Sequence, residues 1–188
     1  MKILFLGYED TPLIDFICRK DEVHATSSRV TKEEVDEYGP DLIVSYGYKH
    51  IIKEDILEPY RNKIINLHIS LLPWNRGYHP NFWSFVDGTP KGVTIHLIDE
   101  GIDTGDILVQ REVIFDVQED TLATTYMRLR KEIESLFIDN WEPLKERKIL
   151  PAAQSNLVGS GHYKKDLNQY WDQLPCGWNT KIKWIEEL

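Results

Sequence analysis

Residues 41–47 have the sequence Asp-Leu-Ile-Val-Ser-Tyr-Gly, a short apolar run that ends at a glycine. Residues 2–7 (Lys-Ile-Leu-Phe-Leu-Gly) repeat this pattern, and residues 64–68 (Ile-Ile-Asn-Leu-His) form a third run. Short apolar runs of this kind are typical of strands that are buried on both faces of a parallel sheet. The runs alternate with helix-like stretches, which predicts an α/β domain.

Helix starts are expected between the first runs. Thr11 followed by Pro12 predicts a helix through Arg19, because threonine caps helices well and proline suits the first helical position. Thr31, with Glu34 three residues later, predicts a second helix that begins with a capping box.

The second half of the chain completes the predicted sheet. Residues 93–98 alternate apolar and polar side chains, and residues 107–114 do so less strictly. These strands are close enough in sequence to pair antiparallel, so we expect a mixed, mostly parallel sheet flanked by helices. Residues 119–148 carry apolar side chains three or four positions apart, which predicts a long helix that Pro143 kinks or ends. Packing of this stripe on the chain's own sheet is favoured, and a homodimer seam stays open.

The expected domain organisation is one core domain over residues 1–150. Residues 149–163 are predicted to be a loop, since they contain Pro151, Gly159 and Gly161. We expect residues 151–188 to be a short C-terminal extension that packs on the core.

Composition excludes several classes of protein. The chain has 188 residues and a formal net charge of −9, which disfavours nucleic acid and anionic membranes as partners. Its two cysteines, Cys18 and Cys176, are far apart, which excludes a cysteine-rich zinc module. Cys18 falls in an apolar stretch and is predicted to be a buried thiol. No secretory signal or membrane-spanning run of roughly 18 residues is present, so the expected location is cytoplasmic.

Polar side chains of three kinds follow the predicted strands. Asn66 and His68 lie two residues apart, so both can point to one face of an extended chain. Asp103 lies in a glycine-bounded loop, residues 99–105. An amide, an imidazole and a carboxylate suit acyl transfer. Taken singly, Asn66 could satisfy a strand end, His68 could be a core histidine and Asp103 could form a turn.

Two cofactor classes are disfavoured. No Gly-x-Gly-x-x-Gly follows the first strand, because Tyr8 comes directly after Gly7, so a dinucleotide-dependent oxidoreductase is not expected. His68, His79, His96 and Asp103 include no pair at the close spacing of common zinc motifs, so no metal is predicted.

The combination of motifs resembles a known family, the formyltransferases that use 10-formyltetrahydrofolate. The matching residues are Asn66-Leu67-His68-Ile69-Ser70-Leu71-Leu72-Pro73, Arg76-Gly77, residues 92–96 (Gly-Val-Thr-Ile-His) and residues 101–107 (Gly-Ile-Asp-Thr-Gly-Asp-Ile). The motifs run from about residue 47 to 110, and the likeness of fold extends to about 150. The resemblance implies a Rossmann-like core, with residues 1–150 as the catalytic domain.

The resemblance also implies roles for particular residues. The family's catalytic asparagine, histidine and aspartate fall on Asn66, His68 and Asp103, so an active N-formyltransferase is expected. The co-substrate 10-formyltetrahydrofolate would lie in a cleft lined largely by backbone. By position, the cofactor-binding residues would be Lys49, His50, Ile52, Asp99, Glu100 and Ile102.

The acceptor amine is predicted from the residues after the catalytic motif. Family members that formylate tRNA are longer and carry a nucleic-acid-binding domain, which this short acidic chain disfavours. Residues 76–80 (Arg-Gly-Tyr-His-Pro) look more like the sugar N-formyltransferases. These act on a nucleotide-linked deoxyamino sugar in surface polysaccharide and lipopolysaccharide biosynthesis. A small-molecule acceptor held by Arg76, Gly77 and Tyr78 is therefore expected. A glycinamide ribonucleotide formyltransferase and a silent folate-binding protein are the alternatives.

Aromatic residues crowd this predicted acceptor site. Trp74, Tyr78, Phe82 and Trp83 could stack on a sugar or a nucleoside base. Alternatively, Phe82 and Trp83 bury the helix that starts at residue 80, and for Trp83 this is favoured. Arg76 could bind a phosphate or carboxylate, or pair with an acidic side chain, and both roles stay open.

Overall fold

A six-stranded mixed sheet lies at the centre of the computed structural model, which describes residues 1–154 and 158–186. The strand order is β2-β1-β3-β4-β6-β7. The strands are β1 (Lys2–Gly7), β2 (Glu22–Thr26), β3 (Leu42–Tyr46), β4 (Ile64–His68), β6 (Gly92–Leu97) and β7 (Ile107–Glu112). The first four pair in parallel, and β6 pairs antiparallel with both β4 and β7. The predicted mixed, mostly parallel sheet is confirmed.

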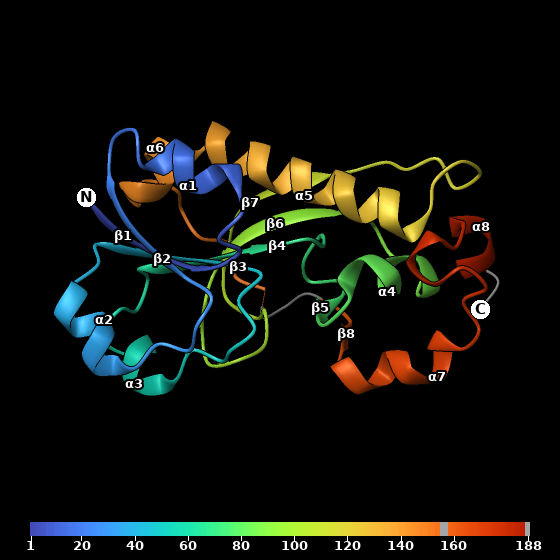
Figure 1. Ribbon diagram of the computed structural model, residues 1–188, viewed down its shortest axis with the longest axis horizontal. Coiled ribbons are helices and arrows are strands. Elements are labelled where there is room, and N and C mark those ends of the chain that lie inside the picture. The colour runs from blue at the N-terminus through green and yellow to red at the C-terminus, as the bar shows by residue number, and fades with distance from the viewer. Residues whose placement is uncertain (155–157, 187–188) are drawn as a thin grey trace.

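Helices cover both faces of this sheet (Figure 1). On one face lie α1 (Pro12–Ile17), α5 (Leu122–Asp139) and α6 (Trp141–Lys145). On the other face lie α2 (Lys32–Tyr38) and α3 (Glu54–Leu57), over the first strands. On the face away from α5, strands β4 and β6 are covered by loops and by a smaller lobe. The candidate site residues Asn66 and His68 lie on this face.

The helix starts agree with the sequence, but α1 ends earlier than predicted. Thr11 caps α1, and Thr31 forms the capping box of α2 with Glu34. Because α1 ends at Ile17, Cys18 lies just beyond it and is exposed. The prediction of a buried thiol was wrong. Ile17 faces the core, and each further residue in a helix turns by about 100°, so Cys18 points away from the core.

The predicted long helix is divided into α5 and α6. The break falls at Asn140, and Pro143 lies in the first turn of α6. A proline ring clashes with the carbonyl four residues earlier, here that of Asp139. The helix therefore ends at Asp139 and restarts, with Pro143 at a position where no backbone N–H is needed.

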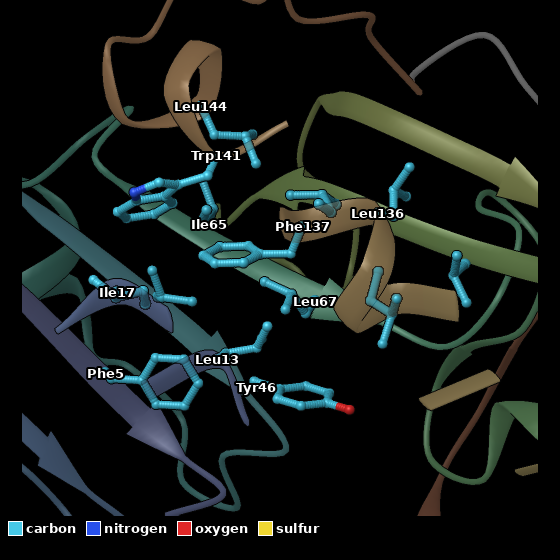
Figure 2. Close-up of a cluster of buried hydrophobic side chains, with 14 of the residues drawn as sticks. Phe5, Leu13, Ile17, Tyr46, Ile65, Leu67, Leu136, Phe137, Trp141 and Leu144 are labelled. Carbon is cyan, nitrogen blue, oxygen red and sulfur yellow. The ribbon is translucent and has the colours of Figure 1, made fainter. Parts of the chain in front are cut away.

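The main hydrophobic core lies between the sheet and the helices α1, α5 and α6 (Figure 2). The apolar stripe of α5 belongs to it, with Leu129, Ile133 and Phe137 fully buried. These side chains pack against Phe5 and Ile65 of the sheet. The stripe is thus covered by the chain's own strands, as favoured from the sequence.

A smaller lobe extends beyond the sheet (Figure 1, right). It contains β5 (Arg76–Gly77), α4 (Pro80–Val86), β8 (Gly161–His162), η1 (Lys164–Leu167), α7 (Asn168–Trp171), η2 (Gly177–Asn179) and α8 (Ile182–Ile185). Phe82 and Trp83 are buried in its own hydrophobic cluster, so they serve packing. Strands β5 and β8 pair in parallel, which joins the C-terminal segment to the central one. In the part of the chain described, no helix is long and apolar enough to cross a membrane.

Candidate active site

Strand β4 presents Asn66 and His68 to one face of the sheet. Ile65 and Leu67, which alternate with them, pack in the main core under α5. Successive side chains of a strand point to opposite faces, so Asn66 and His68 point to the face away from α5. His68 is almost fully buried there.

Asp103 reaches the same face from the loop between β6 and β7. The Asp99 carboxylate shapes this loop by accepting the Gly101 N–H (3.1 Å) and the Thr104 hydroxyl (2.7 Å). Asp103 itself has φ +53°, a left-handed conformation that aspartate tolerates better than most residues. The turn directs its carboxylate back toward β4.

The Asp103 carboxylate is the group that the other candidate residues share. Its Oδ1 accepts a hydrogen bond from Asn66 Nδ2 (3.1 Å), and its Oδ2 accepts the Gly77 backbone N–H (2.8 Å). His68 Nδ1 lies 3.6 Å from Oδ2. The structure therefore brings Asn66, His68 and Asp103 together, with Gly77 as their neighbour.

His96 is a further member of this cluster that the sequence did not single out as a site residue. Its Nε2 lies 3.1 Å from Asn66 Nδ2 and 3.4 Å from Asp103 Oδ1, and its Nδ1 lies 2.6 Å from the Leu97 carbonyl. A carbonyl only accepts, so Nδ1 carries the proton, and in the neutral ring Nε2 accepts from Asn66. Both amide hydrogens of Asn66 are then engaged, one by His96 and one by Asp103.

The charges of the cluster follow from burial and from these contacts. Burial alone would raise the pKa of the Asp103 carboxyl, but the positive charge that His68 carries once it is protonated, the contact with His96 and the Gly77 N–H together hold it well below its usual range. Burial lowers the pKa of the His68 ring from its ordinary 6.5, against the pull of Asp103. At neutral pH, Asp103 is ionised and His68 is neutral. His68 Nε2 donates to the Asn75 carbonyl (3.2 Å).

Gln154 holds the Asp103 loop by hydrogen bonds, and no sequence pattern predicted this role for Gln154. Its buried amide donates to the carbonyls of Asp103 (3.2 Å) and Gly105 (2.6 Å). Its Oε1 accepts from the Arg76 guanidinium, at 3.2 Å from Nε and 2.8 Å from Nη2. Arg76 is therefore hydrogen-bonded to a neutral amide and supports the loop.

The predicted acceptor residues lie at the edge of this cluster. Gly77 has φ +88° and pairs with His162 in β8. A Cβ at Gly77 would lie 2.3 Å from the His162 carbonyl oxygen, so only glycine fits. Tyr78 follows directly, donates its N–H to the same carbonyl (2.9 Å) and is exposed.

The predicted folate residues occupy the loops after β3 and β6, the two strands that flank β4. Lys49 and Ile102 are exposed, and His50 is half-buried. Ile52 is buried in the core beside α3, so its side chain does not face a cleft. Glu100 forms an ion pair with Arg61 (3.0 Å), and Asp99 shapes its own loop. Ile51, which the sequence did not single out, follows His50 directly and is 84% exposed.

This chain is similar to known proteins in both sequence and structure. The family model described as formyl transferase matches residues 13–140. The structure is similar to the formyltransferase PseJ from Anoxybacillus kamchatkensis, solved in complex with UDP-4,6-dideoxy-4-formamido-L-AltNAc and tetrahydrofolate. The two share 46% sequence identity and a TM-score of 0.93, over 98% of this chain and 97% of that one. A 4-N formyltransferase from Francisella tularensis, at 24% identity and TM-score 0.76 over 90% of this chain and 79% of that one, shows the fold alone.

Curated relatives of this chain include methionyl-tRNA formyltransferases. The methionyl-tRNA formyltransferase of Finegoldia magna is 32% identical over 145 residues, which are 73% of this chain and 47% of that protein. The methionyl-tRNA formyltransferase of Thermodesulfovibrio yellowstonii is 32% identical over 157 residues, 83% of this chain and 49% of that protein. The chain thus spans about half the length of the curated relatives it matches.

Proposed function

The chain belongs to the formyl transferase family, and we propose that it moves the formyl group of 10-formyltetrahydrofolate to a primary amine. The observation that carries this proposal is the meeting of Asn66 and His68 at the Asp103 carboxylate. An amide donor, a neutral imidazole and a fixed carboxylate in one buried cluster suit the charge and proton changes of acyl transfer.

The residues present fit the folate. The loops after β3 and β6 expose backbone together with the apolar side chains of Ile51 (84% exposed) and Ile102 (49% exposed). Backbone N–H and C=O groups can pair with the donor–acceptor edge of a pterin, and apolar side chains can cover its ring. The residues expected from the sequence, Lys49, His50, Ile52, Asp99, Glu100 and Ile102, remain proposed contacts, through backbone rather than side chain.

As acceptor we propose the amino group of a nucleotide-linked deoxyamino sugar. The support is the likeness to PseJ over almost the whole of both chains, including β8 to α8 of the smaller lobe, which lie outside the match to the family model. The match to tRNA-modifying relatives covers only about half of those proteins. The formylated sugar would then enter surface polysaccharide, including lipopolysaccharide.

The proposed chemistry follows from the cluster. 10-Formyltetrahydrofolate supplies the formyl group on N10; transfer breaks that C–N bond, joins the formyl carbon to the amine and moves one proton from the amine to N10. Asn66 stabilises the negative charge that develops on the formyl oxygen, for which one of its amide hydrogens must leave His96 or Asp103. Neutral His68 takes up the amine proton, and ionised Asp103 stabilises the cation so formed.

A panel of amines tests the proposal. The protein is incubated with 10-formyltetrahydrofolate and with UDP- and dTDP-linked 3-amino and 4-amino sugars or glycinamide ribonucleotide, and the products are weighed by mass spectrometry. A gain of one CO on a nucleotide-linked sugar alone supports the proposal. A gain on glycinamide ribonucleotide alone would identify a purine enzyme instead. Folate binding with no product on any amine would identify a silent binding protein.

A further inference from the structure

An exposed group of aromatic rings lies in the smaller lobe, next to β5. It consists of Tyr78 and His79 after β5, Trp171 at the end of α7 and Trp178 in η2, and we call it the aromatic platform. Ring centroids are 6.3 Å apart for Tyr78 and His79, 5.7 Å for His79 and Trp178, and 5.0 Å for Trp171 and Trp178. Two regions that are distant in sequence, residues 78–79 and 171–178, thus build one surface.

A large part of the surface of the platform rings is exposed to solvent. Tyr78, Trp171 and Trp178 have 45%, 42% and 41% of their surface exposed. Other aromatic residues of the same lobe, Phe82 and Trp83, are almost fully buried. Contiguous exposed apolar surface on a folded chain marks a binding site more often than it marks chance.

The platform continues from the candidate active site. Gly77 donates to the Asp103 carboxylate (2.8 Å), and Tyr78 and His79 are the next two residues. The backbone turns here, since Gly77 has φ +88° and His79 has φ +56° and ψ +42°, so the platform begins within two residues of the contact to Asp103. An acceptor whose amine lies at Asp103 can therefore place its far end on the rings.

A cation lies beside the platform. Lys164, the first residue of η1, is near enough to His79 that its charge adds to burial in lowering the pKa of that ring. Lys165 follows it and is exposed. In a chain of net charge −9, lysines at this place favour a locally negative ligand.

We propose that the aromatic platform stacks the nucleobase of the acceptor, with Lys164 beside its diphosphate. This rests on the proposed function, because it takes the amine end of the same ligand to lie at Asp103. Stacking on aromatic side chains depends on the π-face that every base has, so the platform accepts uracil and thymine alike. Loss of one stacking ring should weaken binding of a nucleoside diphosphate about tenfold to a hundredfold.

The test measures binding of UDP alone and of dTDP alone by isothermal titration calorimetry. Trp178→Leu and Trp171→Leu remove platform rings, and Trp178→Phe keeps an aromatic face. Trp184→Leu is the matched control, since Trp184 is 54% exposed in α8 and makes no platform contact. We expect both nucleotides to bind and Trp178→Leu and Trp171→Leu to lose affinity about tenfold or more. Trp178→Phe should recover much of the loss, and Trp184→Leu should leave the affinity unchanged.

Formylation kinetics and oligomeric state complete the test. With a nucleotide-linked amino sugar that the enzyme formylates, Trp178→Leu should raise KM and leave kcat nearly unchanged. Unchanged nucleotide affinity in both tryptophan-to-leucine variants would overturn the proposal. So would a change from dimer to monomer in Trp178→Leu with UDP affinity unaltered, because a second copy would then cover the rings.

The two proposals fail separately. Binding of UDP through Trp171 and Trp178 without formylation of any nucleotide-linked sugar keeps the platform and removes the proposed acceptor. Formylation of such a sugar with KM unaltered in Trp171→Leu and Trp178→Leu keeps the acceptor and removes the platform.

Discussion

Gly77 donates its backbone N–H to Asp103 Oδ2 across 2.8 Å, and this contact joins the smaller lobe to the candidate catalytic cluster. Gly77 is held by β8, since its neighbour Tyr78 donates to the His162 carbonyl. The orientation of the Asp103 carboxylate therefore depends on a strand pair whose two halves are distant in sequence.

Gly77→Ala should disturb this pair. The new Cβ would lie 2.3 Å from the His162 carbonyl oxygen, in a backbone with φ +88° that alanine adopts poorly. We expect a loss of about 1–3 kcal/mol in the free energy of unfolding and a clear fall in formyl transfer. Urea unfolding and the formyl-transfer assay measure the two effects.

Gly88→Ala is the matched control for that change. Gly88 has φ +61°, but a Cβ there would meet nothing within 4 Å. This variant should lose about 1 kcal/mol from backbone strain and keep its activity. Equal loss of activity in both variants would show that the contact of Gly77 with Asp103 is not what matters.

Asn66→Ala should lower kcat by about 10²–10³, the usual effect of removing one donor that stabilises an oxyanion. His68→Ala and Asp103→Ala, which remove the proton acceptor and the carboxylate that stabilises its charged form, should lower kcat by about 10²–10⁴. Circular dichroism should show that each variant is folded. Near-normal turnover in all three would remove the catalytic assignment, whatever the acceptor.

Gln154→Ala tests a positioning role. The change removes the donors that hold the Asp103 and Gly105 carbonyls and frees the Arg76 guanidinium. We expect kcat to fall while KM for the folate changes little. Gln154→Glu should do no better, because a carboxylate accepts from Arg76 but cannot donate to the two carbonyls. Gln118→Ala, at an exposed position, is the control that should behave as wild type.

The pH dependence of activity follows from the two shifted groups. The pKa of His68 lies below its ordinary 6.5 and that of Asp103 below its ordinary 3.8, so both are in their working forms at neutral pH. We expect kcat to fall only on the acid side, with a midpoint below 6.5. A midpoint above that value would contradict a neutral buried His68.

The free energy of unfolding should also fall as the pH becomes acidic. Because the folded pKa of His68 is below 6.5, the unfolded chain binds more protons, so stability is present above 6.5 and is lost as pH falls from there toward the folded pKa. Asp103 adds stability that is present above 3.8 and is lost as pH falls through its folded pKa. Urea unfolding over this range should show a smaller acid loss in His68→Gln than in wild type.

The sequence predicted the elements that have strong local signals. The apolar runs of β1, β3 and β4 and the caps at Thr11 and Thr31 all lie where expected. Strand β2 was missed because it lies at the sheet edge with half-exposed side chains and has no continuous apolar run.

The rest of the site could not be predicted because it depends on pairing across the chain. His96 meets Asn66 only because β6 pairs antiparallel with β4 in the register that places them opposite each other. Gln154 lies in a loop without any pattern, and only the folded chain brings its amide to the Asp103 loop.

The pairing of β5 with β8 also affects what happens when related formyltransferases exchange their C-terminal segments. The family model ends at residue 140, yet His162 and Gln154 hold the backbone and side chains around Asp103. A graft of residues 158–186 between two relatives would exchange Trp171 and Trp178 of the proposed aromatic platform together with His162, which pairs with Gly77. We therefore expect acceptor range and turnover to change together in such a recombined chain.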